Sequence, residues 1–207
     1  MLKSLFDSRH ERLLKAISAN DVDKLAGLLS KVDAEHLTMP GRDGRHPLEQ
    51  ALSSDEPRIL ELLLQKAQRP LPTAHCGTPL ICLALQQVDS LSKLTLLLQA
   101  GEDANQAHQG RPLLHLCIEH CDPPRLMLHL SRLLQHGADI NALDANSCTP
   151  VQRLLPSGDQ ALLQFLLQSG AECREEWLAD VDNPELVTQL KRVLDDLKIR
   201  KMMMGGN

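Results

Sequence analysis

Residues 144–172 read DANSCTPVQRLLPSGDQALLQFLLQSGAE, and this stretch decides the fold. Thr149 can cap the free N–H groups at the start of a helix, and Pro150 suits the first helical turn because its missing N–H needs no partner there. The Leu-rich run at 162–167 predicts a second helix, and Gly170 suits the left-handed residue that ends it. The stretch therefore predicts a helix-turn-helix unit.

Parts of the same pattern recur earlier in the chain. Residues 133–141 read LLQHGADIN and residues 96–105 read LLLQAGEDAN. In both, as in the first stretch, a Leu-rich run is followed by a glycine and an exit that contains an acidic residue. Thr78-Pro79-Leu80 repeats the helix opening. A Leu-rich helix pair has too little surface to bury its apolar faces alone, so stacked copies must complete the core.

These copies resemble the ankyrin repeat, a family whose pattern is a Gly-containing turn, Thr-Pro-Leu-His at the first helix, an apolar second helix and a Gly-Ala-Asp-x-Asn exit. The resemblance implies a period of about 33 residues. It places at equivalent positions Pro47, Pro79, Leu113 and Pro150. Residues 46–49 replace the Thr and His of the motif, and in this alignment the turn at 76–78 lacks one residue. The implied fold class is all-α, an ankyrin-type helix-turn-helix solenoid with short β-turn tips between repeats.

We expect a single ankyrin repeat domain over residues 1–201. Residues 8–31 hold two short amphipathic patterns, 11–18 and 22–29, which predict an N-terminal capping helix pair within 1–40. An apolar stripe after Pro184 predicts C-terminal capping helices over 175–201, with 202–207 as a frayed tail. Four repeats lie between the caps, at residues 41–73, 74–106, 107–143 and 144–174.

Composition narrows the class of protein. Hydrophobic residues make up 43% of the chain and aromatic residues only 1%, which favours Leu-packed helices over strands. The net charge of -5 gives no basic field for nucleic acid or an anionic membrane. Charges interrupt the apolar start, so no export signal is expected, and the six cysteines are interpreted as reduced thiols of a cytoplasmic protein.

The strongest candidate for chemistry is the group His115, Cys117, His120 and Cys121, because Cys and His are the usual zinc ligands. The spacing lacks the paired Cys-x-x-Cys of a strong zinc motif. By resemblance, His115 is instead the structural histidine that supports the turn by hydrogen bonding, and Cys117 takes a small buried position. We therefore expect no metal and no other cofactor.

Two further cysteines differ in their expected surroundings. Cys82 lies within the first helix of its repeat and is interpreted as a small core residue. Cys148 precedes Thr149 at a solvent-facing position, so its thiol could react, although no neighbour in the sequence clearly lowers its pKa.

Catalytic motifs are missing from the sequence. It contains no Gly-x-Ser-x-Gly elbow, no phosphate-binding loop and no dinucleotide fingerprint. The paired acids at 175–176 and 195–196 are adjacent rather than facing, which is typical of solvated helix charges. We therefore expect no enzymatic activity and no catalytic residues.

By resemblance, the residues that flank each turn glycine contact the partner. They are Arg42, Asp43, Arg45, His75, Gly77, His108, Gln109, Arg111, Ala145, Asn146 and Cys148. Three arginines and two histidines against one aspartate suggest a partner with an acidic patch, because arginine binds carboxylates bidentately. One alternative is that these charges only keep the loop tips soluble, and another is a pH switch through His75 and His108.

Together these features predict a non-enzymatic protein–protein interaction module that binds another protein through the concave face of the repeat stack. We expect a monomer that binds neither nucleic acid nor membrane. The alternative is a small metal-binding or thiol-redox-responsive regulatory protein, which would use the cluster at 115–121 and Cys148. A bacterial effector or an immunity protein is a third possibility, which differs in destination rather than in mechanism.

Overall fold

The computed structural model describes residues 2–204, with side chains described for residues 9–203. The chain forms two compact units, Met1–His108 and Gln109–Asn207, which we name unit 1 and unit 2. The boundary between the units lies in one of the turns that connect repeats.

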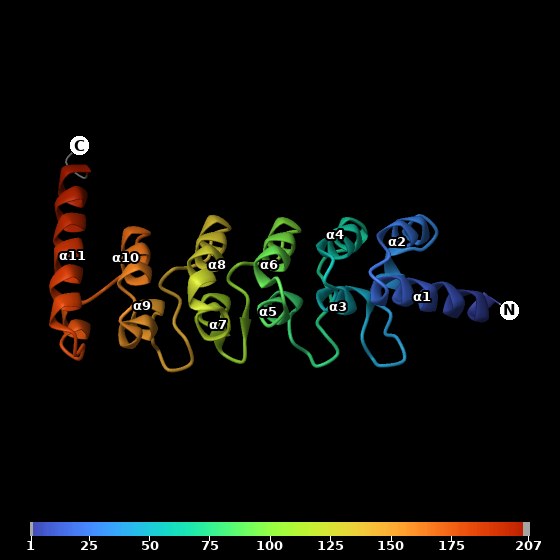
Figure 1. The fold of residues 1–207 in the computed structure, drawn as a ribbon, viewed down its shortest axis with the longest axis horizontal. Coiled ribbons are helices and arrows are strands. Elements are labelled where there is room, and N and C mark those ends of the chain that lie inside the picture. Colours follow the sequence, from blue (N-terminus) through green and yellow to red (C-terminus); the bar gives the residue numbers. More distant parts are fainter. Residues whose placement is uncertain (1, 205–207) are drawn as a thin grey trace. The chain divides into compact units, whose positions relative to one another are not determined.

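Unit 1 contains α1 (Leu2–Ser18), α2 (Val22–Leu29), η1 (Ala34–Leu37), α3 (Pro47–Leu52), α4 (Pro57–Lys66), α5 (Leu80–Ala84), α6 (Ser90–Gln99) and β1 (Ala107–His108). Its helices stand in two rows, α1, α3 and α5 in one and α2, α4 and α6 in the other (Figure 1). Within unit 1, each helix packs against its partner in the same repeat and against a neighbouring helix of its own row. This is the stacking that Leu-rich helix pairs require.

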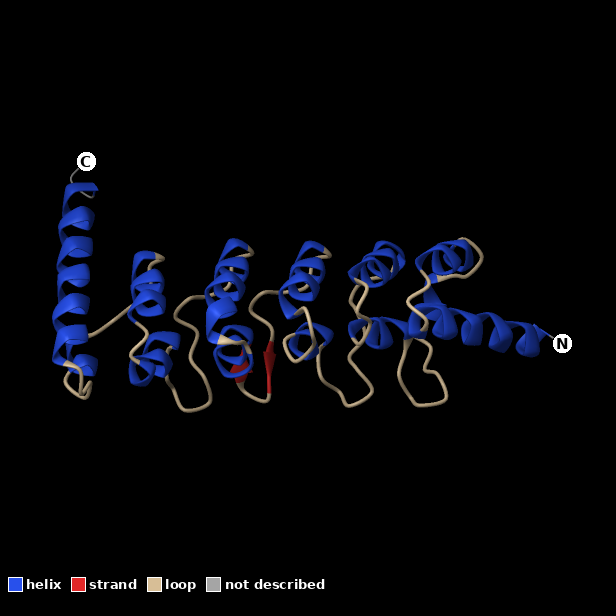
Figure 2. Cartoon of the chain, in the orientation of Figure 1, coloured by secondary structure: helices blue, strands red, loops and turns tan. Residues whose placement is uncertain are grey.

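Unit 2 contains β2 (Arg111–Pro112), α7 (Leu113–His120), α8 (Pro123–Gln135), α9 (Pro150–Leu154), η2 (Leu155–Ser157), α10 (Gln160–Gln168), η3 (Glu175–Leu178) and α11 (Pro184–Met204). α7 packs against α8 and α9, while α10 packs against α9 and α11. Figure 2 shows that loops join most of the helices, and that the short strand β2 lies directly before α7. The first helix of each repeat, α7 or α9, follows closely after a turn.

Leucine supplies most of the core of each unit. In unit 1, Leu48, Leu60 and Leu97 are fully buried, and in unit 2, Leu130 and Leu163 are fully buried. Burial of each such side chain stabilises the fold by about 1.5–3 kcal/mol relative to leaving it in water. The apolar runs are thus accounted for by packing between neighbouring helices.

The turns before α3, α5 and α9 share one backbone pattern. At 41–45, the Gly41 N–H donates to the Arg45 carbonyl over 2.7 Å and the Gly44 N–H donates to the Gly41 carbonyl over 3.1 Å. Residues 74–78 and 144–148 form the same two hydrogen bonds at the same spacing. The turn at 74–78 is therefore complete, and the prediction that it lacks a residue is wrong.

The displaced residue in that repeat is Pro79. It stands at the N-cap of α5, where His46 caps α3 and Thr149 caps α9. Leu80, rather than Pro79, is therefore equivalent to Pro47. Because a proline at the cap offers no side-chain acceptor, α5 begins without the capping bond that α3 and α9 have.

Most of the predicted fold is found in the structure, and two helix ends differ from the prediction. The all-α class and the stacked helix-turn-helix repeats are confirmed within each unit. The two N-terminal amphipathic patterns form α1 and α2, although α1 begins earlier, at Leu2. α11 continues to Met204, so residues 202–204 of the expected tail are helical, and 205–207 lie outside the described residues. The single domain and its repeat boundaries stay predictions.

Over residues 2–204, none of the helices combines the length and the apolar character that crossing a bilayer requires.

Candidate partner-binding surface

The predicted contact residues lie in the turns and beside the first helices of each unit. In unit 1 these are Arg42, Asp43, Arg45, His75, Gly77 and His108. In unit 2 these are Gln109, Arg111, Ala145, Asn146 and Cys148. The shared turn pattern adds Cys76 and Thr78, which flank Gly77 as Asp43 and Arg45 flank Gly44. Sequence reasoning missed these two residues because its alignment placed the turn one residue out.

The arginines of the first turn contact acidic side chains of their own unit. Arg42 Nη2 lies 2.6 Å from Glu11 Oε1, yet 92% of the Arg42 side chain stays exposed. Arg45 Nε lies 4.0 Å from Asp43 Oδ2, at the limit of an ion pair. The local positive charge that the sequence suggests is thus partly balanced within the unit.

His75 has a buried partner that the sequence did not reveal. Glu49 on α3 is only 4% exposed and accepts two hydrogen bonds from the next turn. The His75 N–H donates to Glu49 Oε2 over 2.9 Å, and His75 Nδ1 lies 2.5 Å from Glu49 Oε1. Glu49 therefore fixes the turn of the following repeat, and His75 is held rather than free.

Histidines also join the repeats through backbone carbonyls. His46 Nε2 lies 3.0 Å from the Thr73 carbonyl in unit 1, and His115 Nε2 lies 2.8 Å from the Ala142 carbonyl in unit 2. His115 thus supports the following turn by hydrogen bonding, as its resemblance implied. Burial is the main cause that lowers the pKa of His46, and His75 adds to it, against the raising effects of the Thr73 carbonyl and the Glu49 charge, so the neutral ring is favoured.

The turn before α9 is organised by Asp144, which is nearly buried. Asp144 Oδ1 accepts from the N–H groups of Asn146 over 2.8 Å and Cys148 over 2.9 Å, and Arg153 Nε donates to Oδ2 over 2.6 Å. Burial alone would raise the pKa of Asp144, but these hydrogen bonds together hold it below its usual range. Two of the predicted contact residues are therefore oriented by one carboxylate.

Arg111 is the third arginine of the predicted set. Its Nη1 lies 2.7 Å from Glu119 Oε2, and both side chains are about one-third exposed, at 37% each. Like Arg42, Arg111 lies at the surface within reach of a partner while paired to an acid of its own unit.

Two hollows in unit 2 share Trp177 in their linings. One has a volume of 500 Å³ and includes Cys148, Leu155 and Leu186, and the other has a volume of 400 Å³ and includes Leu143 and Ser147. Trp177 and Gln152 line both. The predicted contact residue Cys148 therefore shares a hollow with an aromatic side chain, a link that no sequence motif indicates.

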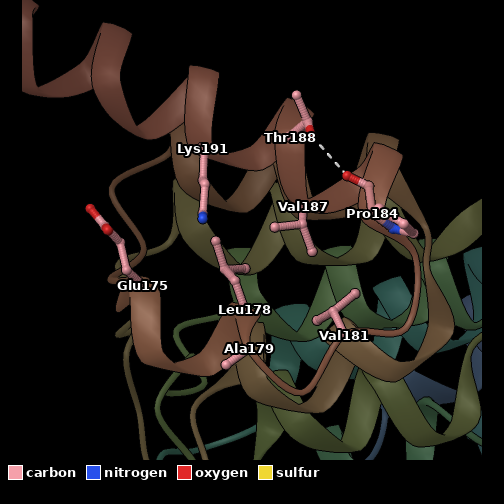
Figure 3. A pocket seen from close by; sticks show the side chains of 8 residues that line it. All are labelled: Glu175, Leu178, Ala179, Val181, Pro184, Val187, Thr188 and Lys191. Carbon is pink, nitrogen blue, oxygen red and sulfur yellow. Dashed lines mark hydrogen bonds between the residues drawn. The ribbon is translucent and has the colours of Figure 1, made fainter.

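A third hollow, of 430 Å³, lies between η3 and the start of α11 (Figure 3). Leu178, Val181 and Val187 provide its apolar wall, as Figure 3 shows. The Thr188 hydroxyl donates to the Pro184 carbonyl over 2.8 Å, so it is engaged by its own helix. Glu175 and Lys191 also line the hollow, so its apolar wall is bordered by two charged side chains.

The predicted zinc candidates separate in the structure. His115 bonds to a carbonyl of the next turn, whereas Cys121 contacts Cys117 and a residue outside the candidate set, His129. Among the described residues, no three His, Cys, Asp or Glu side chains are grouped to hold a metal ion. Cys82 is buried, as expected, and burial raises its pKa to about 11.

The chain is similar to parts of several known proteins. No protein-family model matches the chain. Mouse Rabankyrin-5 is 23% identical over 64% of the chain, and the chicken nuclear factor NF-kappa-B p105 subunit is 32% identical over 63%. The ADP-ribosylation factor GTPase-activating protein AGD2 of Arabidopsis thaliana is 39% identical over 34% of the chain. The matches span only 11%, 13% and 9% of these relatives.

Solved structures match over a larger share of the chain. The ankyrin repeat domain of Bcl-3, titled a unique member of the IkappaB protein family, has a TM-score of 0.64 at 23% identity and covers 90% of this chain and 81% of its own. The ankyrin repeat protein EF0377 has a TM-score of 0.63 at 20% identity, covering 75% and 79%. The chain therefore has the ankyrin repeat fold, which confirms the resemblance of its repeats.

Proposed function

We propose that the chain is a non-enzymatic module that binds another protein through the turns and first helices of its repeats, the side that is concave in ankyrin stacks. The observation that carries this proposal is Trp177, which lines two adjoining hollows next to the predicted contact residue Cys148. Tryptophan is enriched among the residues that dominate binding energy at protein interfaces, because it buries a large rigid surface.

The arginines support a partner with exposed carboxylates. An exposed ion pair contributes only about 0–1 kcal/mol, so a partner's carboxylate can replace Glu11 at Arg42 at small cost. The same holds for Arg111 and Glu119, which are both partly exposed. Arginine can bind the incoming carboxylate through two parallel hydrogen bonds, which favours an acidic patch on the partner.

The charge, the cysteines and the helix packing of the chain bear on its class of partner, its location and its oligomeric state. The net charge of -5 favours a protein partner over nucleic acid or an anionic membrane. A cytoplasmic location fits six cysteines that are all unpaired by disulfides. The chain is proposed to act as a monomer, because stacking within the units already accounts for its Leu-rich helix faces.

The test is capture of partners from a lysate of the source cells by the full chain and by surface variants. One variant carries Trp177→Ala, and another carries Arg42→Glu, Arg45→Glu and Arg111→Glu. The matched control carries Arg58→Glu on α4, which breaks a similarly exposed ion pair, with Glu61 at 2.7 Å, on a second-row helix. Circular dichroism verifies the helical content of each variant.

The expected result is a partner that the wild-type chain and the Arg58 control retain and that both surface variants lose by at least about tenfold, since hot-spot truncations cost about 2 kcal/mol or more. Equal capture by all variants would exclude this surface. If only the triple variant lost the partner, the proposal of an acidic partner would stand, and Trp177 would not belong to the interface.

A further inference from the structure

A cluster of two thiols and an imidazole lies where α7 meets α8 in unit 2. Cys117 belongs to α7, Cys121 forms the C-cap of that helix, and His129 belongs to α8. The cluster takes no part in the proposed partner surface, and its His129 was not among the residues that the sequence singled out.

The positions of the three side chains are fixed by the backbone. The Cys121 N–H donates to the Cys117 carbonyl over 2.9 Å, so the two cysteines lie one helical turn apart. One turn of helix separates the two Cα atoms by about 6 Å, which is within the span of a disulfide. The Cys121 sulfur is hydrogen-bonded to both the Cys117 thiol and the His129 ring.

The orientation of His129 follows from its other contact. Its Nδ1 lies 2.9 Å from the Arg125 carbonyl, and because a carbonyl only accepts, Nδ1 must carry a proton. Nε2 is therefore the ring atom that meets Cys121. An imidazole held in this way can take the proton of a thiol and remain beside the resulting thiolate.

Electrostatics favour that charged pair. The hydrogen bond from Cys117 and then the contact with His129 lower the pKa of Cys121 to about 5, against the opposing effect of burial, and His120 adds a smaller lowering. Burial lowers the pKa of His129, and Arg125 lowers it further, but the hydrogen bond with Cys121 and the Arg125 carbonyl outweigh both and raise it. Without such partners, burial raises the pKa of Cys82 to about 11.

The three residues of the cluster differ in exposure. Cys121 is nearly buried, at 9% exposed, whereas Cys117 and His129 are 0% and 1% exposed. Cys121 is therefore the residue of the cluster that a small molecule meets first, and Cys117 lies one helical turn away from it. A thiol beside an imidazole and a second thiol differs from an inert core cysteine.

We propose that Cys121, activated by His129, is oxidised by hydrogen peroxide and that Cys117 then closes an intramolecular disulfide with it. In the first step the Cys121 thiolate attacks one peroxide oxygen, the O–O bond breaks, and the leaving hydroxide takes a proton from His129 to form water. In the second step Cys117 attacks the sulfur of the Cys121 sulfenic acid, the S–O bond breaks, and a second water leaves. Two thiols are oxidised and one peroxide is reduced.

The first test measures alkylation of the reduced full chain by iodoacetamide at each cysteine, between pH 6 and pH 8, by peptide mass spectrometry. Cys121 is expected to change its rate by less than about threefold, because its thiolate is already formed. The control is Cys173, whose pKa is raised by burial and whose rate should rise about tenfold per pH unit. A tenfold rise per pH unit at Cys121 would overturn the proposal.

The second test treats the reduced chain with hydrogen peroxide. The peptide that carries both cysteines is expected to lose two hydrogens, and Cys117→Ser should leave a Cys121 sulfenic acid that dimedone traps. His129→Gln should slow alkylation of Cys121 at pH 6 but not at pH 9, which a merely structural role for His129 would not produce. Cys82→Ser is the control and should change neither readout.

Failure to form the disulfide in the wild-type chain, or dimedone trapping at other cysteines but not at Cys121, would refute the proposal. Should His129→Gln fail to fold, the pH profile of the wild-type chain still decides the matter. None of these outcomes depends on capture of a partner, so the thiol site and the partner surface are tested separately.

Discussion

The starts of α3 in unit 1 and α9 in unit 2 occupy equivalent positions in their repeats, but different residues cap the free N–H groups there. Both have proline at the first helical position, Pro47 and Pro150. α9 has a capping box, in which Thr149 accepts from the Gln152 N–H and Gln152 Oε1 accepts from the Thr149 N–H over 2.9 Å. In α3, His46 accepts from the Glu49 N–H over 3.2 Å.

The difference lies in what the third helical residue does. Gln152 turns back to its own cap, so α9 closes its start with local contacts. Glu49 reaches forward to His75 in the next turn, and His46 reaches the Thr73 carbonyl. At the start of α3, Glu49 and His46 therefore form a joint between neighbouring repeats, whereas the start of α9 is closed by a local cap.

The largest expected effect is at that joint. Glu49→Ala removes a buried acceptor of two hydrogen bonds and leaves the His75 N–H without it, so the free energy of unfolding should fall by about 2 kcal/mol. Gln152→Ala removes only one half of a local capping box, with an expected loss of about 0.5–1 kcal/mol. Urea denaturation followed by circular dichroism measures both. Similar losses would contradict the distinction between a joint and a cap.

The second expectation concerns pH. The folded state lowers the pKa of His46, because burial disfavours the charged ring and because Nδ1 must stay unprotonated to cap α3. Below the unfolded value of about 6.5 the unfolded chain binds more protons than the folded chain at this site, so stability is lost as the pH falls from 7.5 to 5.5. This one site can contribute at most about 1.4 kcal/mol per pH unit.

The matching turn before α9 should not follow that pH dependence. The pKa of Asp144 is held low, so its contribution is present above about pH 4 and is lost only under more acidic conditions. His46→Thr, which installs the cap found in α9, should reduce the change in urea midpoint between pH 7.5 and 5.5. An unchanged pH profile in this variant would assign the dependence to other histidines.

Sequence reasoning found the repeats because their signals are local. Pro150, Thr149 and the Leu-rich runs each act within a few residues, so their spacing alone predicts helix pairs and their order. The turn at 74–78 was misjudged because Pro79 looks like the proline of the other repeats, and only the backbone hydrogen bonds reveal it as a cap.

The candidate site was less accessible to sequence reasoning because its contacts cross between elements. The pairing of Arg42 with Glu11 joins residues of the first turn and α1, and that of Glu49 with His75 joins neighbouring repeats. The thiol cluster shows the same limit, since the sequence grouped Cys121 with histidines of its own helix, whereas the effective partner, His129, lies on the next. The sequence signal for this partner was His129, a histidine at a position of α8 that the helical pattern buries.

The smallest expected effect concerns the turns themselves. Gly44 precedes α3 and adopts a φ of 83°, while Ser147 has the same place before α9 with a φ of 59°. A side chain in this left-handed region is strained, whereas glycine accepts it. Ser147→Gly should therefore raise the free energy of unfolding and Gly44→Ser should lower it, in each case by about 0.5 kcal/mol.

Both effects are small for the same physical reason. Glycine gives the unfolded chain more freedom, which offsets part of the strain in both directions, and a Cβ at position 44 would meet only the Cβ of His75 at 4.0 Å, an ordinary contact. Urea midpoints of the two single variants and of the double variant measure the effects, which should add because the residues lie in different repeats. If Ser147→Gly were destabilising, Ser147 would have to contribute more than its backbone strain costs, and the turn before α9 would depend on its side chain as α3 depends on Glu49.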